Sequence, residues 1–383
     1  MRISTRRTAM ATAVVAVALV MSACGSSGGG ASSSSPATTG SSSAAAFDAA
    51  AAEAITKPYT GQPSEFPITT DLVKNPKGKR IAYLDCGTPI CGLFSQLAAP
   101  AFKELGMEFT TIKAGFQPDV VQQAFDAVIA GKYDGIFVPA IPPQLWERGL
   151  EQAKSAGIPI VTSGVVGADP TWVKVQQAGE NSASIAGKVM AAWALQQKQA
   201  ETDAVLYTTP ELPFQAVISK SFTETYKQLC PGCKLRETKV SAATFGTKSA
   251  QVIIDDLQAN PSTNVAVLGI GEQGAGLPAA LKTAGITLPF MVNSPDPAIL
   301  EGIKKGDFTA GLGLDLPVIS WTVADSLARQ TMGDEPAPGA VEDIPPQQIL
   351  VAADLQYDVS KGWTGYPDFP ERFTKLWAPA LKS

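Results

Sequence analysis

The chain has 383 residues, a length that suits two domains with appendages rather than one small module. It contains no histidine, which argues against zinc hydrolase and Ser-His-Asp chemistry, because histidine is the commonest metal ligand and proton shuttle. Hydrophobic residues make up 45% and charged residues 17%, a balance typical of a globular chain, and the net charge of −5 argues against nucleic-acid binding.

The N-terminus has the pattern of a bacterial export signal. Arginines within residues 1–7 precede an apolar run, Ala9–Val20, which is shorter than the roughly 20 residues a transmembrane helix needs. The run leads into Leu19-Val20-Met21-Ser22-Ala23-Cys24, which resembles a lipobox with methionine where leucine is more usual. We expect residues 1–23 to be a signal peptide and Cys24 to carry a lipid anchor that includes a palmitate chain. An ordinary secretory signal is the alternative, and export by either the Sec or the twin-arginine route stays open.

Residues 24–78 are expected to be a tether and approach segment. Residues 25–46 are rich in Gly, Ser and Ala and have nothing to bury, so they predict a flexible coil. The protein is therefore expected to be anchored by its lipid to the outer face of the bacterial cytoplasmic membrane.

The cysteines beyond Cys24 form two close pairs. Export implies an oxidising compartment, and of the three possible connectivities we expect the local one, Cys86–Cys91 and Cys230–Cys233. Cys230-Pro-Gly-Cys233 follows a helical run at 219–229, so the pair lies at a helix C-terminus, where the helix dipole disfavours a thiolate. This context favours a structural disulfide over a redox site.

From Lys79 onward, strands and helices alternate. In the first half the hydrophobic patterns predict strands at 80–84, 108–112, 135–138 and 158–162, and helices at 93–105, 119–130 and 144–156. In the second half they predict helices at 182–199, 214–229, 248–259, 278–284 and 297–305, and strands at 204–207, 265–268, 290–292 and 309–314, with another strand ending at 239–240. The alternation indicates right-handed βαβ units, and the similarity of Lys154–Pro159 to Lys282–Thr287 suggests two alike halves.

Residues 79–355 resemble the type I periplasmic binding proteins, the ribose-binding-like receptors of ABC transporters. Four segments carry the resemblance: Gly135–Ala140, Ala156–Val161, Glu180–Gly187 and Gly302–Asp307. The resemblance implies an α/β fold of two similar Rossmann-like lobes with parallel sheets, joined by a three-strand hinge, with a ligand cleft between them. It assigns 79–178 and 316–340 to an N-terminal lobe, 179–315 and 341–355 to a C-terminal lobe, and 356–383 to a tail. The crossings are expected near 177–181, 313–317 and 335–345.

In open parallel sheets, ligands bind beyond the carboxyl ends of the strands. The expected ligand-binding residues follow such strand ends or lie at a crossover: Asp85, Thr88, Phe94, Ser163, Glu211, Phe214, Gln215, Phe245, Glu272, Asn293, Ser294 and Asp315. Phe94 is a candidate for ring stacking, with core packing as the alternative. Thr162-Ser163-Gly164 stands where sugar binders of this family often carry an Asp-Arg pair. With no arginine in the set, a small neutral polar or cationic ligand is favoured over an anion.

These features predict a monomeric, lipid-anchored solute-binding protein that delivers a sugar, polyol or related solute to an ABC permease. No metal, cofactor, nucleic acid or enzymatic activity is expected. Gly269-Ile270-Gly271-Glu272-Gln273-Gly274 has the dinucleotide-binding form but lacks the acidic residue expected further along, and it is interpreted as a ligand loop. The alternatives are a sensory receptor for a signalling partner, or a binder of an aromatic, amine or nucleoside-like solute.

Overall fold

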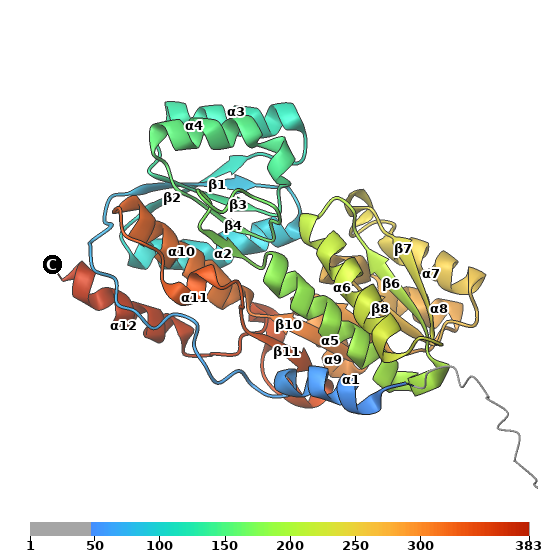
Figure 1. Ribbon diagram of the computed structural model, residues 1–383. Coiled ribbons are helices and arrows are strands. Elements are labelled where there is room, and N and C mark those ends of the chain that lie inside the picture. Colours follow the sequence, from blue (N-terminus) through green and yellow to red (C-terminus); the bar gives the residue numbers. More distant parts are fainter. Residues whose placement is uncertain (1–46, 383) are drawn as a thin grey trace, which may run out of the picture. The chain divides into compact units, whose positions relative to one another are not determined.

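The computed structural model describes residues 47–382, which belong to one compact unit (Figure 1). The expected signal peptide, the lipidation site at Cys24 and the Gly/Ser-rich tether lie outside the described residues.

The N-terminal lobe is built on a five-stranded parallel sheet with the order β2-β1-β3-β4-β5. Its strands are β1 (Arg80–Asp85), β2 (Glu108–Lys113), β3 (Gly135–Pro139), β4 (Ile160–Ser163) and β5 (Val175–Gln177). Helices connect them: α2 (Pro89–Glu104), α3 (Pro118–Ala130) and α4 (Glu147–Ala156). The sheet order and the parallel pairing follow from the predicted βαβ rhythm, although the short strand β5 was not predicted.

Alternate side chains of each strand pack on opposite faces of this sheet. Ile81 and Tyr83 join the core under α2 and α10 (Leu316–Thr331), whereas Ala82 and Leu84 join the core under α3 and α4. Figure 1 shows α3 and α4 together on one side of the strands. Both faces are therefore covered, which explains why β1, β3 and β4 read as continuous apolar runs.

The C-terminal lobe has a six-stranded sheet with the order β11-β10-β9-β8-β6-β7. Its strands are β6 (Asp203–Thr208), β7 (Lys234–Lys239), β8 (Val265–Leu268), β9 (Phe290–Asn293), β10 (Ala310–Leu314) and β11 (Gln347–Leu350). Its helices are α5 (Glu180–Lys198), α6 (Pro213–Leu229), α7 (Ser249–Ala259), α8 (Leu277–Ala284) and α9 (Pro297–Lys305). The edge strand β11 runs antiparallel to β10, so this sheet is mixed rather than wholly parallel.

The two lobes repeat one local device where a helix enters a strand. Gly157 after α4 and Gly285 after α8 both adopt left-handed backbone conformations, with φ of 69° and 68°. Glycine adopts this conformation without the steric penalty of a Cβ atom, so each helix ends there. These are the glycines of the two similar segments in the sequence.

Three connections carry the chain between the two sheets: β5 to α5, β10 to α10, and α11 (Pro338–Val341) to β11. A residue of the third connection also caps the helix α5 that follows the first connection. The buried carboxylate of Asp343 accepts hydrogen bonds from the backbone N–H groups of Gly179 (2.9 Å), Asn181 (3.0 Å) and Ser182 (3.3 Å). The N-terminus of α5 is therefore satisfied by a side chain from a distant part of the sequence.

The segments flanking the two lobes are folded onto them. Helix α1 (Ala49–Thr56) packs on α5, while Ile68 and Leu72 lie in the core of the N-terminal lobe. At the other end of the chain, Trp363 joins the core of the C-terminal lobe, and α12 (Phe369–Leu381) packs on the N-terminal lobe. Residues 47–78, for which the sequence predicted no structure, thus form part of the folded body.

A buried ion pair fixes both flanking segments to α10. The Arg329 guanidinium pairs with Asp325 at 2.8 Å and also donates to the carbonyl oxygens of Thr70 (2.6 Å) and Asp71 (3.0 Å). The Trp377 indole N–H of α12 donates to the same Asp325 carboxylate at 2.9 Å. We call this set of five residues the terminal anchor.

Candidate functional site: a pocket between the lobes

Several loops that follow strands begin with an unusual backbone conformation. Ala140 after β3, Ala178 after β5 and Ser294 after β9 have φ of 48°, 50° and 48°, and Gly164 after β4 has φ of 68°. A left-handed conformation costs a non-glycine residue on the order of 1 kcal/mol. These residues turn the chain sharply at the carboxyl ends of the strands, and all of them line one pocket.

This pocket takes side chains from both lobes and from the connections between them. The N-terminal lobe contributes Ile90, Phe94, Ala140, Ser163, Gly164 and Ala178. The C-terminal lobe contributes Ser182, Ala183, Ala186, Phe214, Ile218, Ile270, Asn293 and Ser294. The connections contribute Leu314, Leu316 and Gln347. The empty space between these side chains is about 580 Å³, a volume that includes space open to solvent.

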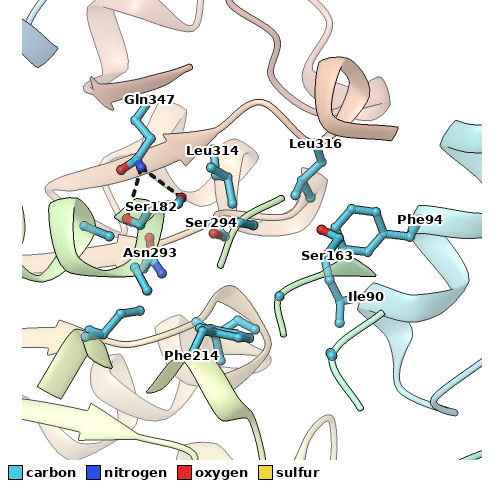
Figure 2. Close-up of a pocket in the computed structure, with 17 residues that line it drawn as sticks. Ile90, Phe94, Ser163, Ser182, Phe214, Asn293, Ser294, Leu314, Leu316 and Gln347 are labelled. Atoms are coloured by element: carbon cyan, nitrogen blue, oxygen red, sulfur yellow. Dashed lines mark hydrogen bonds between the residues drawn. The ribbon is translucent and has the colours of Figure 1, made fainter. Parts of the chain in front are cut away.

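The lining of this pocket is mostly apolar. None of its residues carries a charge, and Phe94 and Phe214 approach it from opposite lobes (Figure 2). Phe94 is only 5% exposed and also contacts Phe137 edge to face at 6.1 Å, so it serves both the core and the pocket. The site therefore offers apolar and aromatic surface with a few polar groups.

Some of those polar groups already bond within the protein. The Asn293 amide donates to the Gly269 carbonyl at 3.0 Å. The Gln347 amide donates to the carbonyl (3.3 Å) and hydroxyl (3.2 Å) oxygens of Ser182 (Figure 2). By contrast, the Ser163 hydroxyl and the Gln347 Oε1 atom are buried and have no hydrogen-bond partner among the described residues. These two atoms retain the capacity to bond a ligand.

Five of the residues expected from the sequence line this pocket: Phe94, Ser163, Phe214, Asn293 and Ser294. Their strands and helices bring them together because parallel strands end at a common edge of the sheet.

Other residues in the expected set are occupied elsewhere. Asp85 accepts the Gly87 N–H at 3.0 Å, and Thr88 precedes the first turn of α2. Glu211, which is exposed, accepts the Ser241 hydroxyl. The buried Gln215 amide joins two strand-end loops, since it accepts from Thr209 N–H (3.2 Å) and donates to Gly269 O (2.8 Å).

Phe245 and Asp315 also lie outside the residues that line the pocket. Phe245 is half-buried against the apolar clusters of both lobes. Asp315 is 0% exposed and caps α10 through the Val318 N–H (3.1 Å), while its other oxygen accepts from Thr364 Oγ1 (3.0 Å) and Gly365 N–H (2.8 Å). Burial raises the pKa of Asp315 to about 7. Its oxygens serve a helix cap and the C-terminal segment in this structure.

Glu272 lies at the edge of the pocket and connects the lobes. It lines an adjoining hollow that shares Ile90, Ile270 and Ser294 with the pocket. Its Oε1 atom accepts the Ile90 N–H at 2.9 Å, whereas Oε2 has no partner among the described residues. Burial raises the pKa of Glu272 to about 7. Glu272 thus caps the N-terminus of α2 from the opposite lobe.

The disulfides follow the local pattern, Cys86–Cys91 and Cys230–Cys233. The first joins the end of β1 to the first turn of α2, the helix that carries Phe94, and the Tyr83 hydroxyl donates to the Cys91 carbonyl beneath it. The second follows the end of α6, away from the residues that line the pocket.

Several lining residues were missed from the sequence. Ser182, Ala183 and Ala186 lie in the first turns of α5, within the segment Glu180–Gly187 that carries part of the family resemblance. Their small size at the start of a helix after a crossing was the available signal. Gln347 had no such signal, because it reaches the pocket only through the long-range pairing of β11 with β10.

Among residues 47–382, no cluster of three His, Cys, Asp or Glu side chains is arranged to hold a metal ion. No helix in this part of the chain combines the length and apolar character needed to cross a bilayer.

A pocket lined by two α/β lobes, at the carboxyl ends of their sheets, defines a two-lobed ligand-binding protein. Residues 91–335, more than half of the chain, match the family model described as the periplasmic binding protein domain. The chain belongs to this family and has the type I fold, as its sequence predicted. The family consists of solute-binding proteins rather than enzymes.

Solved structures of similar fold include several sugar-binding proteins. A galactofuranose binding protein is 16% identical, with a TM-score of 0.63 over 74% of this chain and 100% of that one. A 5-methylthioribose transporter solute binding protein from Thermotoga lettingae TMO is 14% identical, with a TM-score of 0.64 over 79% and 99%. A solute binding protein from Agrobacterium vitis, bound with alpha-D-tagatopyranose, is 17% identical, with a TM-score of 0.62 over 73% and 96%. No curated protein matches the sequence significantly.

Proposed function

We propose that the protein is the extracytoplasmic solute receptor of an ABC importer, which holds a small molecule between its lobes and delivers it to the permease. One observation carries the proposal: a single pocket takes its lining from both lobes and from the connections between them. A ligand there contacts both lobes at once, so its binding favours the state in which they are close together.

The chain connections supply a hinge for this movement. We assign 79–178 with 316–340 to one lobe and 179–315 with 341–355 to the other. The Asp343 cap joins the first and third connections, and the Glu272–Ile90 hydrogen bond joins the lobes beside the pocket. In this proposal the hydrogen bonds of the Asp343 cap persist when the lobes move apart, whereas the Glu272–Ile90 hydrogen bond breaks.

The N-terminal sequence supports a lipid anchor in the same proposal. Cys24 would carry the lipid, and residues 25–46 would hold the folded body, which the structure describes from Phe47 onward, at a distance from the membrane. Producing cells should attach a labelled fatty acid, such as tritiated palmitate, to the wild-type chain and not to a Cys24→Ser variant. Equal labelling of both chains would contradict lipid attachment at Cys24.

A thermal-shift screen tests the binding function. The screen should cover sugars, polyols, amines, nucleosides and neutral aromatics. A ligand at 100 times its Kd stabilises the native state by about 2.7 kcal/mol. Ala186→Phe places a ring in the pocket and should abolish the shift, whereas Ala279→Phe, on the exposed face of α8, should retain it. A shift that survives Ala186→Phe would refute the pocket assignment, and the absence of any shift across the screen would refute the function.

Measurements of solute uptake and of the transcriptional response to the solute distinguish a transport role from a sensory role. Deletion of the gene should abolish uptake of the radiolabelled compound found in the screen, and restoring the wild-type chain should recover it. Unchanged uptake with a lost transcriptional response to the compound would favour a sensory receptor instead.

A further inference from the structure

We infer that the solute is an uncharged, mainly apolar ring compound with one or two polar groups, rather than a free sugar. This inference rests on the proposed function, because it concerns the ligand of the same pocket. It is carried by the chemistry of the lining and by the hydrogen bonds that its polar groups already make.

The apolar part of the lining surrounds the space from both lobes. Phe94 and Ile90 face it from the N-terminal lobe, Phe214 from the C-terminal lobe, and Leu314 from a connection (Figure 2). Ile270 of the C-terminal lobe also belongs to the lining. Aromatic and aliphatic side chains on opposing walls favour a ligand with apolar faces on both sides.

A sugar would find too few partners in this pocket. Each sugar hydroxyl both donates and accepts, and a buried hydroxyl without a partner is unfavourable. The amide nitrogens of Asn293 and Gln347 are already bonded to Gly269 and Ser182. Within the lining, the buried atoms without partners among the described residues are the Ser163 hydroxyl and Gln347 Oε1, and the half-buried Ser294 adds one more hydroxyl. This is a small set for the several hydroxyls of a sugar.

An anion would find no basic side chain in this pocket. No lysine or arginine lines the pocket, and the other usual anion site is a helix N-terminus. Four helices have first-turn residues in the lining, and three of their N-termini already hold carboxylates of the protein: Asp343 at α5, Glu272 at α2 and Asp315 at α10. The fourth, α6, begins at Pro213 and turns the apolar Phe214 side chain toward the pocket.

A cation would find no carboxylate in the lining. Glu272 belongs to the adjoining hollow, and one of its oxygens is held by the Ile90 N–H. The lining therefore favours an uncharged ligand over an ammonium ion as well as over a carboxylate.

The two buried polar atoms without partners among the described residues, Ser163 Oγ and Gln347 Oε1, lie in different parts of the site. Figure 2 shows Ser163 beside Phe94 and Ile90, whereas Gln347 lies with Ser182 and Asn293. A ring between Phe94 and Phe214 can thus accept a hydrogen bond from Ser163 or donate one to Gln347 Oε1. This placement predicts a hydroxyl or carbonyl group at the periphery of the ligand's ring system.

The test compares probes that differ mainly in charge or polarity. 2-Naphthol, 2-naphthoate and 2-(aminomethyl)naphthalene share one ring system, and D-ribose, D-galactose and myo-inositol represent sugars and polyols. Calorimetric titration of the full chain in detergent should give 2-naphthol a Kd at least tenfold below the other five. Phe214→Ala should raise that Kd at least tenfold, whereas Phe116→Ala, a half-buried phenylalanine outside the lining, should leave it unchanged.

A further pair of variants tests the polar contact. Ser163→Ala should weaken 2-naphthol binding several-fold, whereas Thr162→Ala, at the neighbouring buried hydroxyl outside the lining, should not. Each variant is first checked for a cooperative unfolding transition. If Ser163→Ala unfolds, Ser163→Cys, which keeps the side-chain volume and replaces the hydroxyl by a weak S–H donor, provides the same comparison.

The outcomes separate the ligand class from the function. Tight binding of a sugar or polyol without 2-naphthol overturns the ligand class and leaves the solute-binding function standing. Equal binding of the naphthoate or the amine overturns the uncharged character. Absence of binding by all six probes also overturns the ligand class, and the function falls with it only if the wider screen is blank as well.

Discussion

The terminal anchor and the pocket satisfy polar groups in opposite ways. In the terminal anchor, Arg329 and Asp325 are buried and charged, and their hydrogen bonds to Thr70, Asp71 and Trp377 complete the network. The pocket has an uncharged lining, two buried polar atoms without partners among the described residues, and left-handed residues at its strand ends. The difference indicates that charge stabilises the fold, whereas spare hydrogen-bond capacity and apolar surface are reserved for the ligand.

The largest expected effect comes from breaking the terminal anchor. Arg329→Leu leaves Asp325 buried without its ion-pair partner, which should lower the free energy of unfolding by about 3–5 kcal/mol. Lys305→Leu removes a more exposed i,i+4 pair with Glu301, for which about 0–1 kcal/mol is expected. Denaturant titration of both variants measures the difference. Equal losses would show that the terminal anchor contributes no more than a surface pair.

The next effect concerns Glu272, the carboxylate beside the pocket. Because burial raises its pKa from 4.5 to about 7, the folded protein binds more protons than the unfolded chain between these values. Its stabilising contribution is thus complete below about pH 4.5 and is lost as the pH rises to about 7, on the order of 2–3 kcal/mol. The Glu272→Gln variant should not lose this stability as the pH rises, because glutamine does not titrate. Its side-chain oxygen can still accept the hydrogen bond from the Ile90 N–H.

Unfolding of the Glu272→Gln variant should be measured across this pH range. Glu104→Gln, an exposed change on α2, serves as the control and should follow the wild type. If the free energy of unfolding of Glu272→Gln depends on pH as it does in the wild type, the pH dependence does not come from Glu272.

The two disulfides offer a matched comparison. Replacing either pair by serines should lower the free energy of unfolding by about 2 kcal/mol, because each bridge closes a similarly short loop. Only the Cys86–Cys91 change should also weaken ligand binding, since this bridge supports the turn before Phe94. Calorimetry on both double variants checks the prediction. Equal effects of the two replacements on affinity would show that the Cys86–Cys91 bridge has no particular role in supporting the pocket.

The smallest effect tests backbone strain at the pocket. Ala178→Gly relieves a left-handed alanine and should raise the free energy of unfolding by about 0.5–1 kcal/mol. Lys132→Gly relieves a similar conformation, with φ of 51°, outside the pocket lining and should give a similar gain. Only Ala178→Gly should reduce affinity, because it loosens a strand end that lines the site. Destabilisation by both changes would show that neither residue is strained.

The sequence predicted the repeated parts of this fold well, because their signals are local. Val265–Leu268 reads as a buried strand, and 297–305 carries the period of a helix; both have these bounds in the structure. The docking of α1 and α12 was not predicted, because an amphipathic segment does not specify which distant surface covers it. The edge strand β11 was also not predicted, because its pairing with β10 is long-range.

The site was predicted in part, and the outcome depends on residue type. Phe94, Phe214 and Asn293 follow strand ends and line the pocket. Asp315 was expected there because a carboxylate at a crossing can accept ligand hydroxyls, but it caps a helix and holds the C-terminal segment. Sequence position identified the edge of the sheets, whereas only the packed structure shows which polar atoms are already used.

Amide hydrogen exchange tests the central claim most directly. It should be measured with and without the compound that gives the largest thermal shift. The account predicts slower exchange at the start of α2 and at the start of α5, one in each lobe, with α4 unchanged. Protection confined to one lobe, or absent from both helix starts, would contradict a ligand held between the lobes.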